Sequence, residues 1–287
     1  MAIEFTHVDV FSARPYSGNS LAVFSDSSGL TTEQMLRITQ ELRHFEAVFF
    51  EPTGNASVFR ARVFDLFEEL PFAGHPLIGG GAVLHHQAGL REPQTWTVEL
   101  ASKTVTVNTD RTDGGYYGLL DQGTPSLSPP LDRLAVFPES FGLSQSDLHP
   151  DLPPQVVSTG LRYLILPVVQ GALGRARIRR DLTSMLGGIG AQFAVLFDEA
   201  ALEIRHWNND GIVEDVATGS AAGTIGAYRL RHGLTRGGES FMLHQGQYVG
   251  RRSVLRVRSE GTAEAIQTIK VGGDVAFVGC GTLDALP

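Results

Sequence analysis

The side chains in this sequence with the clearest chemical potential are Glu46, His75 and Asp215. Glu46 lies in an apolar run, where loss of solvent raises the pKa of a carboxylate towards neutrality. A carboxylate with such a pKa suits a general base that takes a proton from one atom and returns it to another. The alternative interpretation is an exposed glutamate in a loop.

His75 and Asp215 belong to a stretch that occurs twice in the chain. The copies are Glu69-Leu70-Pro71-Phe72-Ala73-Gly74-His75-Pro76 and Glu214-Asp215-Val216-Ala217-Thr218-Gly219-Ser220-Ala221-Ala222-Gly223. Glu69 and Gly74 recur as Glu214 and Gly219 at one offset, since 214 − 69 and 219 − 74 are both 145. This spacing predicts two related halves.

Each copy is expected to open a helix of small residues directly after a strand. The first N–H groups of a helix have no partner within it, and the helix dipole adds positive charge there. We therefore expect Gly74 and Gly219, with His75 and Ser220 beside them, to hold a carboxylate or phosphate group. A structural histidine at position 75 and a helix-capping serine at position 220 are the alternatives.

Asp215 also has two interpretations. It could cap the following helix through its carboxylate, or it could bind the amino group of a ligand. Glu69 and Glu214 occupy equivalent places in the two copies, which favours a shared structural role.

The elements around these residues predict an α+β protein of two similar domains, each a curved, mostly antiparallel sheet around a central helix. The helix at 76–86 carries three consecutive glycines, which indicates either close packing against a neighbour or a helix N-terminus pressed on a ligand. A further helix is expected at 134–143. The Pro- and Ser-rich stretch 124–130 is expected to be a linker between domains at 1–124 and 131–287. The last strand could also pack back on the first domain.

Composition excludes several classes of function. A net charge of −8 disfavours nucleic-acid and anionic-membrane binding, and the single Cys280 excludes an intrachain disulfide or a two-thiol racemase. We see no metal-ligand spacing, and therefore expect no metal site, and we see no nucleotide-binding fingerprint. The absence of a signal-like or membrane-spanning segment favours a cytoplasmic location.

The motifs together resemble the PhzF family, the phenazine-biosynthesis isomerases and their relatives, whose architecture is similar to that of diaminopimelate epimerase. The resemblance rests on Asp9 to Phe11, Gly18-Asn19, Ala22 to Phe24, Glu46, residues 69–76, residues 213–223, Gln245-Gly246 and Gly250-Arg251.

The resemblance implies a cofactor-free isomerase, a homodimer, with its site in the cleft between the domains. It implies that Glu46 is the acid and base and that Asp215 faces an amine or hydroxyl of the substrate. Gly74, His75, Gly219 and Ser220 would hold the carboxylate and other polar groups, and Asn19 is expected to bind substrate as well.

Several residues depart from the usual family pattern. Phe45 and Ala47 flank Glu46 where the family usually has small polar residues; Asp65-Leu66 replaces Thr-Pro, and Ser20 and Arg252 each replace a common proline. These departures leave the acid/base plausible but bear on whether the phenazine precursor is accepted.

The function predicted from the sequence is therefore proton transfer between carbons of a small cyclic or amino carboxylate. Two alternatives stay open. One is a one-base racemase or epimerase of an amino acid derivative, and the other is a non-catalytic protein that binds small anions on the same scaffold.

Overall fold

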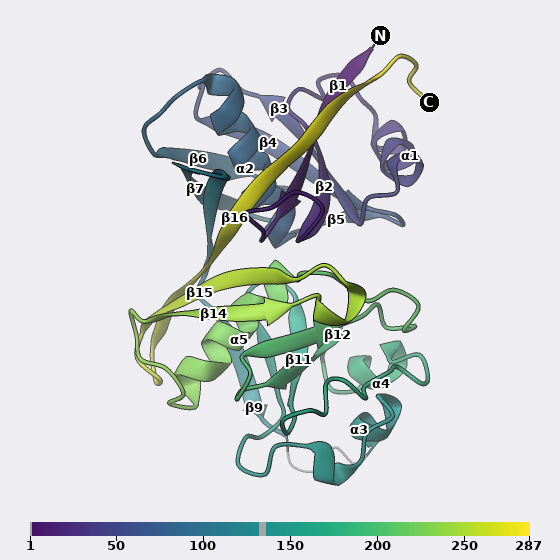
Figure 1. Ribbon diagram of the computed structural model, residues 1–287, viewed down its shortest axis with the longest axis vertical. Coiled ribbons are helices and arrows are strands. Elements are labelled where there is room, and N and C mark those ends of the chain that lie inside the picture. The colour runs from purple at the N-terminus through teal and green to yellow at the C-terminus, as the bar shows by residue number, and fades with distance from the viewer. Residues whose placement is uncertain (1, 132–135) are drawn as a thin grey trace. The chain divides into compact units, whose positions relative to one another are not determined.

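The computed structural model describes residues 2–131 and 136–287, which form two compact units (Figure 1). Unit 1 contains residues 1–121 and 272–287, and unit 2 contains residues 122–271. The chain passes from one unit to the other within strand β8 and returns within strand β16.

Unit 1 is a ring of strands around one helix. Its strand order is β16-β1-β2-β3-β4-β6-β7-β8, and β8 pairs again with β16, so that the ring closes. The elements are β1 (Ile3–Val10), β2 (Asn19–Phe24), α1 (Thr32–Leu42), β3 (Glu46–Pro52), β4 (Val58–Asp65), β5 (Glu69–Leu70), α2 (Gly74–Ala88), β6 (Gln94–Glu99), β7 (Thr104–Thr112), β8 (Gly115–Gly123) and β16 (Ile266–Leu283).

Helix α2 runs through the ring and is buried on all sides from Gly74 to His85. A Cβ atom at Gly79 would lie 2.6 Å from Leu21 of β2, and one at Gly81 would lie 2.9 Å from Val107 of β7. At Gly80 it would collide with the ring of Phe50 in β3. The three glycines therefore let α2 approach three different strands, which confirms the close packing predicted from them.

Helix α1 covers the outer face of β2, β3 and β4. Its Met35 and Ile38 pack against Phe24, Phe49 and other apolar residues that point away from α2. Thr31 and Gln34 form the capping box at its start, each bonded to the backbone of the other. Unit 1 thus has three layers, with α1 outside the sheet and α2 inside it.

Unit 2 repeats this plan with strand order β9-β10-β11-β12-β13-β14-β15-β16 and with α5 as the buried helix (Figure 1). Apolar residues under α3 and α4 cover the outer face of its sheet. The elements are β9 (Ser126–Pro130), α3 (Val136–Ser140), η1 (Gln145–Asp147), β10 (Gln155–Ser158), β11 (Arg162–Pro167), α4 (Thr183–Gly187), β12 (Phe193–Asp198), β13 (Glu203–His206), α5 (Gly219–Arg231), β14 (Ser240–Gln245), η2 (Gln247–Val249) and β15 (Ser253–Gly261).

Strand register identifies equivalent residues in the two units. In unit 1 the parallel pair β2–β3 matches Leu21 with Glu46, and in unit 2 the parallel pair β11–β12 matches Tyr163 with Phe193. The next antiparallel pairs match Val48 with Val63 and Val195 with His206. Phe193 therefore occupies the place in unit 2 that Glu46 occupies in unit 1, and His206 occupies the place of Val63.

The fold class is α+β, as predicted, but two local expectations were wrong. The stretch 124–130 is not an open linker, because Ser126–Pro130 forms β9 and pairs with β10. Its prolines are tolerated because β9 ends the strand order of unit 2. The helix expected at 134–143 is shorter, Val136–Ser140, and residues 134 and 135 lie outside the described residues.

The last residues of the chain, 272–287, belong to unit 1 and not to unit 2. Residues Val275 to Leu283 of β16 pair with β1 in antiparallel register. The expected domains at 1–124 and 131–287 do not separate this segment. The alternative that the last strand packs back on the first domain agrees with the pairing of β16 with β1.

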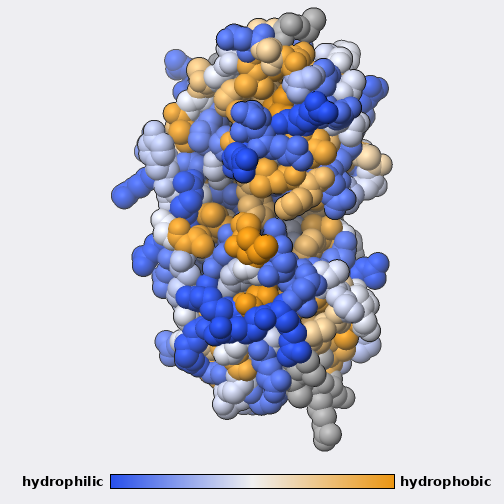
Figure 2. Space-filling model, turned by 90° about the vertical axis from the view of Figure 1, so that its right-hand side faces the viewer, coloured by the Kyte–Doolittle hydropathy of each residue, from blue (hydrophilic) through white to orange (hydrophobic). Residues whose placement is uncertain are grey.

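Most of the visible surface is hydrophilic, and apolar side chains interrupt it in small groups (Figure 2). The large apolar residues with the greatest exposure are Tyr16, Phe67 and Ile212. Among the described residues, none of the helices has both the length and the apolar character required to cross a membrane.

Buried and partly buried histidines give the fold a dependence on pH. Burial lowers the pKa of His85, His206 and His232 below the ordinary value of 6.5. The unfolded chain therefore takes up protons at a higher pH than the folded chain, and stability falls as the pH drops below 6.5.

We predict a lower melting temperature at pH 5.5 than at pH 7.5, measured by differential scanning fluorimetry. His206→Leu should make this fall shallower, because it removes one of the groups that protonate on unfolding. His244→Leu, at an exposed position, is the control and should keep the wild-type slope. An unchanged slope in the His206 variant would contradict the prediction.

Candidate active site

Glu46 and His75 meet at the start of α2. Glu46 begins β3 on the face that carries Val48 and Phe50, both of which lie against Gly80 of α2. Its Oε2 atom is 3.4 Å from Nδ1 of His75. Glu46 is 9% exposed and His75 is 4% exposed, so the pair is nearly removed from solvent. The predicted burial of Glu46 is confirmed.

The start of α2 has no side-chain cap. The N-cap residue is Ala73, which has no polar side-chain atom, and His75 is the second residue of the helix. The amide groups of this first turn and the carboxylate of Glu46 thus lie at one corner of unit 1. We refer to residues 46 and 73–75 as the first corner.

Asn19 is buried at the start of β2, opposite Val10 of β1. It lies two residues before Leu21, which pairs with Glu46, and therefore shares a sheet face with Leu21. The structure thus places Asn19 towards the end of the sheet where the first corner lies.

The start of α5 is also left without a side-chain cap. Its N-cap residue is Thr218, but the Thr218 hydroxyl donates to Oδ2 of Asp215 at 2.5 Å. No hydrogen bond among the described residues uses the N–H groups of Gly219 or Ser220. We refer to residues 215–220 as the second corner.

Asp215 is 4% exposed and is fixed within the second corner. Besides Thr218, it accepts a hydrogen bond from the N–H of Ala217. Gln245 holds the same turn: its Oε1 accepts from the N–H of Thr218, and its Nε2 donates to the carbonyl of Asp215. Asp215 therefore stabilises the turn before the helix, and Thr218 occupies the N-cap position that Asp215 was considered for.

The two glutamates at the start of the repeated stretch have the shared structural role that their equivalent places favoured. Glu69 accepts two hydrogen bonds from Arg62 of β4, and Glu214 accepts two from Arg205 of β13. Each pair ties a glycine stretch to the strand that precedes it.

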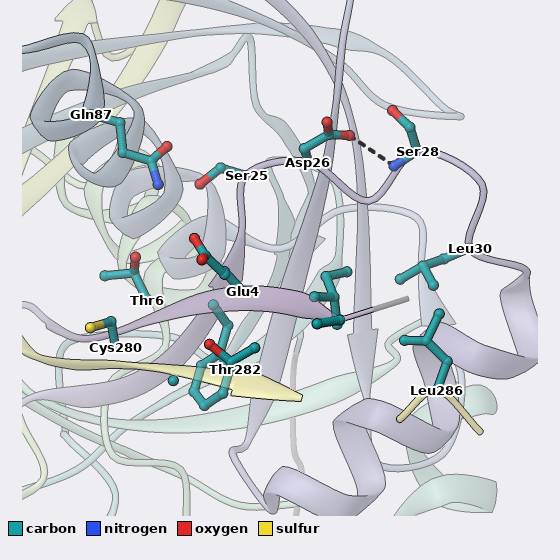
Figure 3. A pocket seen from close by; sticks show the side chains of 14 residues that line it. Glu4, Thr6, Ser25, Asp26, Ser28, Leu30, Gln87, Cys280, Thr282 and Leu286 are labelled. Atoms are coloured by element: carbon teal, nitrogen blue, oxygen red, sulfur yellow. Dashed lines mark hydrogen bonds between the residues drawn. The ribbon is translucent and has the colours of Figure 1, made fainter. Parts of the chain in front are cut away.

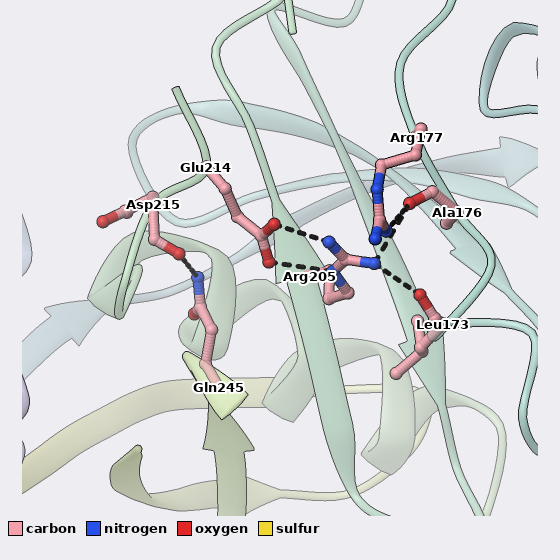
Figure 4. A network of polar contacts seen from close by, with 7 residues as sticks. All are labelled: Leu173, Ala176, Arg177, Arg205, Glu214, Asp215 and Gln245. Carbon is pink, nitrogen blue, oxygen red and sulfur yellow. Dashed lines mark hydrogen bonds and ion pairs between the residues drawn. The ribbon is translucent and has the colours of Figure 1, made fainter. Parts of the chain in front are cut away.

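The two ion pairs differ in burial. The side chains of Arg205 and Glu214 are 2% and 10% exposed, whereas those of Arg62 and Glu69 are 28% and 31% exposed. Arg205 also donates to the carbonyls of Leu173 and Ala176 (Figure 4). Its guanidinium lies 4.4 Å from the ring centre of Trp207 and 4.3 Å from that of Tyr248.

The departures from the family pattern are partly explained by local contacts. Ser20 and His44 hydrogen-bond to each other at 2.8 Å, and Ser20 also bonds His7 at 2.8 Å. Asp65 accepts hydrogen bonds from the N–H groups of Phe67 and Glu68 and so closes the turn before Glu69. Ala47 packs under α1, on the opposite face of β3 from Glu46.

Sequence reasoning missed Arg62, Arg205 and Tyr163. The two arginines could have been found by aligning the repeats, because Arg62-Val63-Phe64 and Arg205-His206-Trp207 both precede a glycine stretch. Tyr163, whose hydroxyl is 2.8 Å from that of Ser220, carries no local signal because 57 residues separate them.

A hollow of about 560 Å³ in unit 1 lies apart from these residues (Figure 3). Its lining includes Glu4, Asp26 and Cys280 but no lysine, arginine or histidine. It therefore lacks the positive groups that a carboxylate would need. Among the described residues, no group of three His, Cys, Asp or Glu side chains could hold a metal ion.

The difference in burial predicts unequal effects of matched substitutions. Glu214→Gln leaves the charge of Arg205 buried without its partner and should lower the free energy of unfolding by about 3 kcal/mol or more. Glu69→Gln, at a partly exposed pair, should cost about 1 kcal/mol. Urea denaturation measures both, and equal or reversed losses would contradict the prediction.

Comparison with known proteins identifies the family of the chain. The family model for phenazine biosynthesis-like proteins, PhzC-PhzF, matches residues 8–281. The chain is 32% identical to an uncharacterized isomerase, PM1503, of Pasteurella multocida, over 96% of this chain and 92% of that protein. It is 29% identical to the trans-2,3-dihydro-3-hydroxyanthranilate isomerase of Pseudomonas chlororaphis, over 96% and 97%.

A solved structure extends the comparison to the fold. The predicted epimerase PA4716 of Pseudomonas aeruginosa matches with a TM-score of 0.93 and 45% identity, over 99% of each chain. The expected diaminopimelate epimerase-like α+β fold is confirmed. The chain belongs to the PhzF family of phenazine biosynthesis-like proteins and is an isomerase.

Proposed function

We propose that this isomerase works without a cofactor and moves a proton between carbons of a small cyclic or amino carboxylate, with Glu46 as the acid and base. The observation that carries the proposal is the buried contact between Glu46 and His75 at the uncapped start of α2. The carboxylate of Glu46 and the first turn of a helix without a side-chain cap lie together there.

The proposed step conserves atoms and charge. The Glu46 carboxylate takes a proton from a carbon whose C–H bond is acidified by conjugation with the substrate's carboxylate. The electron pair of that bond spreads into the conjugated system, and the protonated Glu46 then delivers a proton to another carbon. Oriented amide donors and the side chain of His75 stabilise the enolate-like charge; one such donor is typically worth about 3–4 kcal/mol.

The remaining residues of the two corners serve binding in this proposal. Gly74, Gly219 and Ser220 donate to the carboxylate or to other oxyanions of the substrate. Asn19 and Asp215 contact its polar substituents, with Asp215 suited to an amine or hydroxyl because a carboxylate accepts hydrogen bonds.

Register supports a single acid/base. The place of Glu46 is taken in unit 2 by Phe193, which cannot exchange a proton. A mechanism with one base fits both proton migration and one-base epimerisation, so the racemase or epimerase of an amino acid derivative is the second candidate.

We also propose that the enzyme acts as a homodimer, as the family resemblance implies, and that it is located in the cytoplasm. Trans-2,3-dihydro-3-hydroxyanthranilate, named for the Pseudomonas relative, is the first compound to test. Ala47 lies on the far face of β3, so this departure leaves the surroundings of Glu46 unaltered and favours the test.

We predict that Glu46→Gln lowers the rate of isomerisation by about 10²–10⁴-fold, because the amide cannot take up the proton. Proton NMR in D2O follows the reaction through deuterium incorporation and double-bond migration. Glu51→Gln, the same change on the same strand, is the control and should keep the wild-type rate.

The same experiment separates the candidates. Exchange at one stereocentre without double-bond migration identifies an epimerase. Tight binding of small carboxylates without exchange at any carbon identifies a non-catalytic anion-binding protein. An active Glu46→Gln variant with unchanged substrate affinity would contradict the role of Glu46.

A further inference from the structure

The Ser220 hydroxyl has one protein partner at the second corner. Its Oγ atom is 2.8 Å from the phenol oxygen of Tyr163. Ser220 is 6% exposed and Tyr163 is 2% exposed. In the part of the chain that the structure describes, no other side chain or backbone group bonds this hydroxyl, so its second hydrogen-bonding position is open.

The chemistry of the two hydroxyls favours one direction for their hydrogen bond. A phenol has a pKa of about 10 and is far more acidic than an aliphatic alcohol, so it is the better donor. When Tyr163 donates to Oγ of Ser220, the proton of Ser220 is left for a group outside the protein. In the opposite direction, Ser220 would donate its only hydroxyl proton to Tyr163 and could not donate it to a ligand.

We propose that Tyr163 is a positioning residue that makes Ser220 a hydrogen-bond donor towards the substrate's carboxylate or another oxyanion. This inference rests on the proposed function, since it takes Ser220 as a substrate-binding residue. It also narrows the group that Ser220 and the start of α5 bind, because a donating Ser220 beside the N–H groups of α5 favours an anion over an amine.

The surroundings of Tyr163 suit this role because they hold its ring in place. The ring lies 5.5 Å from that of Phe193 and 5.4 Å from that of His206, measured between centroids. Nδ1 of His206 is 2.9 Å from the carbonyl of Ala194, which fixes the imidazole. Burial lowers the pKa of His206, so the wall beside Tyr163 is uncharged at neutral pH.

Hydrogen bonds also hold the start of α5 in place. Gln122 donates to the carbonyl of Gly219 at 2.9 Å, and Thr159 donates to Oε1 of Gln122 at 2.7 Å. These bonds use the carbonyl side of the first turn and leave the N–H groups of Gly219 and Ser220 open. A rigid phenol and a rigid helix start together fix the direction of one serine proton.

The test is a double-mutant cycle with Tyr163→Phe, Ser220→Ala and the double variant. The probe is 3-hydroxyanthranilate, an aromatic carboxylate without a proton to move between ring carbons, and its affinity is measured by isothermal titration calorimetry. Tyr163→Phe should weaken binding about 3- to 10-fold, the usual range for one neutral hydrogen bond. In the Ser220→Ala background the same change should have no effect.

The control is Tyr228→Phe. Tyr228 is a buried tyrosine of α5, the helix that carries Ser220. It donates to the carbonyl of Pro153, away from the second corner. This change should leave the affinity for the probe at the wild-type value. A loss of affinity for Tyr163→Phe that persists in the Ser220→Ala background would mean a purely structural role and would overturn the proposal.

A second measurement needs no ligand. The tyrosine Fermi doublet in the wild-type-minus-Tyr163→Phe Raman difference spectrum distinguishes a donating phenol from an accepting one. A donating Tyr163 is expected, and an accepting one overturns the inference. In the calorimetry, wild-type affinity in Ser220→Ala would refute the proposed binding role of Ser220. Weakened binding in Ser220→Ala together with wild-type affinity in Tyr163→Phe would refute only the positioning role of Tyr163.

Discussion

The structure depends on one constraint, a helix surrounded by strands on every side. Such a helix has no solvated face over its buried length, so α2 is built mainly of small and apolar residues and carries glycine at three positions where strands approach closely. Its first turn begins inside the wall of strands, with alanine at the N-cap position. The amide groups there are removed from bulk water but not capped, which makes them ready donors for an anion.

Unit 2 has a similar uncapped helix start, but different residues surround it. Register shows that Glu46 and Val63 of unit 1 correspond to Phe193 and His206 of unit 2. The first corner therefore carries the buried carboxylate of Glu46, whereas Phe193 takes the equivalent place in unit 2. The ion pair that ties the second corner to its preceding strand is also the more deeply buried of the two.

Much of the fold could be predicted from the sequence because the duplicated stretch marks both central helices and both corners. The burial of Glu46 followed from its apolar neighbours, and the structural role of Glu69 and Glu214 followed from their equivalence. Other features depend on contacts between residues that are distant in sequence. The pairing of β16 with β1 joins the two ends of the chain, and Tyr163 meets Ser220 across 57 residues. A Pro- and Ser-rich segment such as β9 has linker-like composition, and only its pairing with β10 makes it a strand.

The central claim of the proposed function is that an uncapped helix start holds the substrate's carboxylate while Glu46 faces the carbon that loses its proton. A crystal structure with bound 3-hydroxyanthranilate tests this most directly. We expect a carboxylate oxygen of the ligand within hydrogen-bond distance of the N–H of Gly74 or Gly219, and the carboxylate of Glu46 against the ring. A ligand bound elsewhere, for example in the hollow lined by Glu4 and Asp26, would contradict the account.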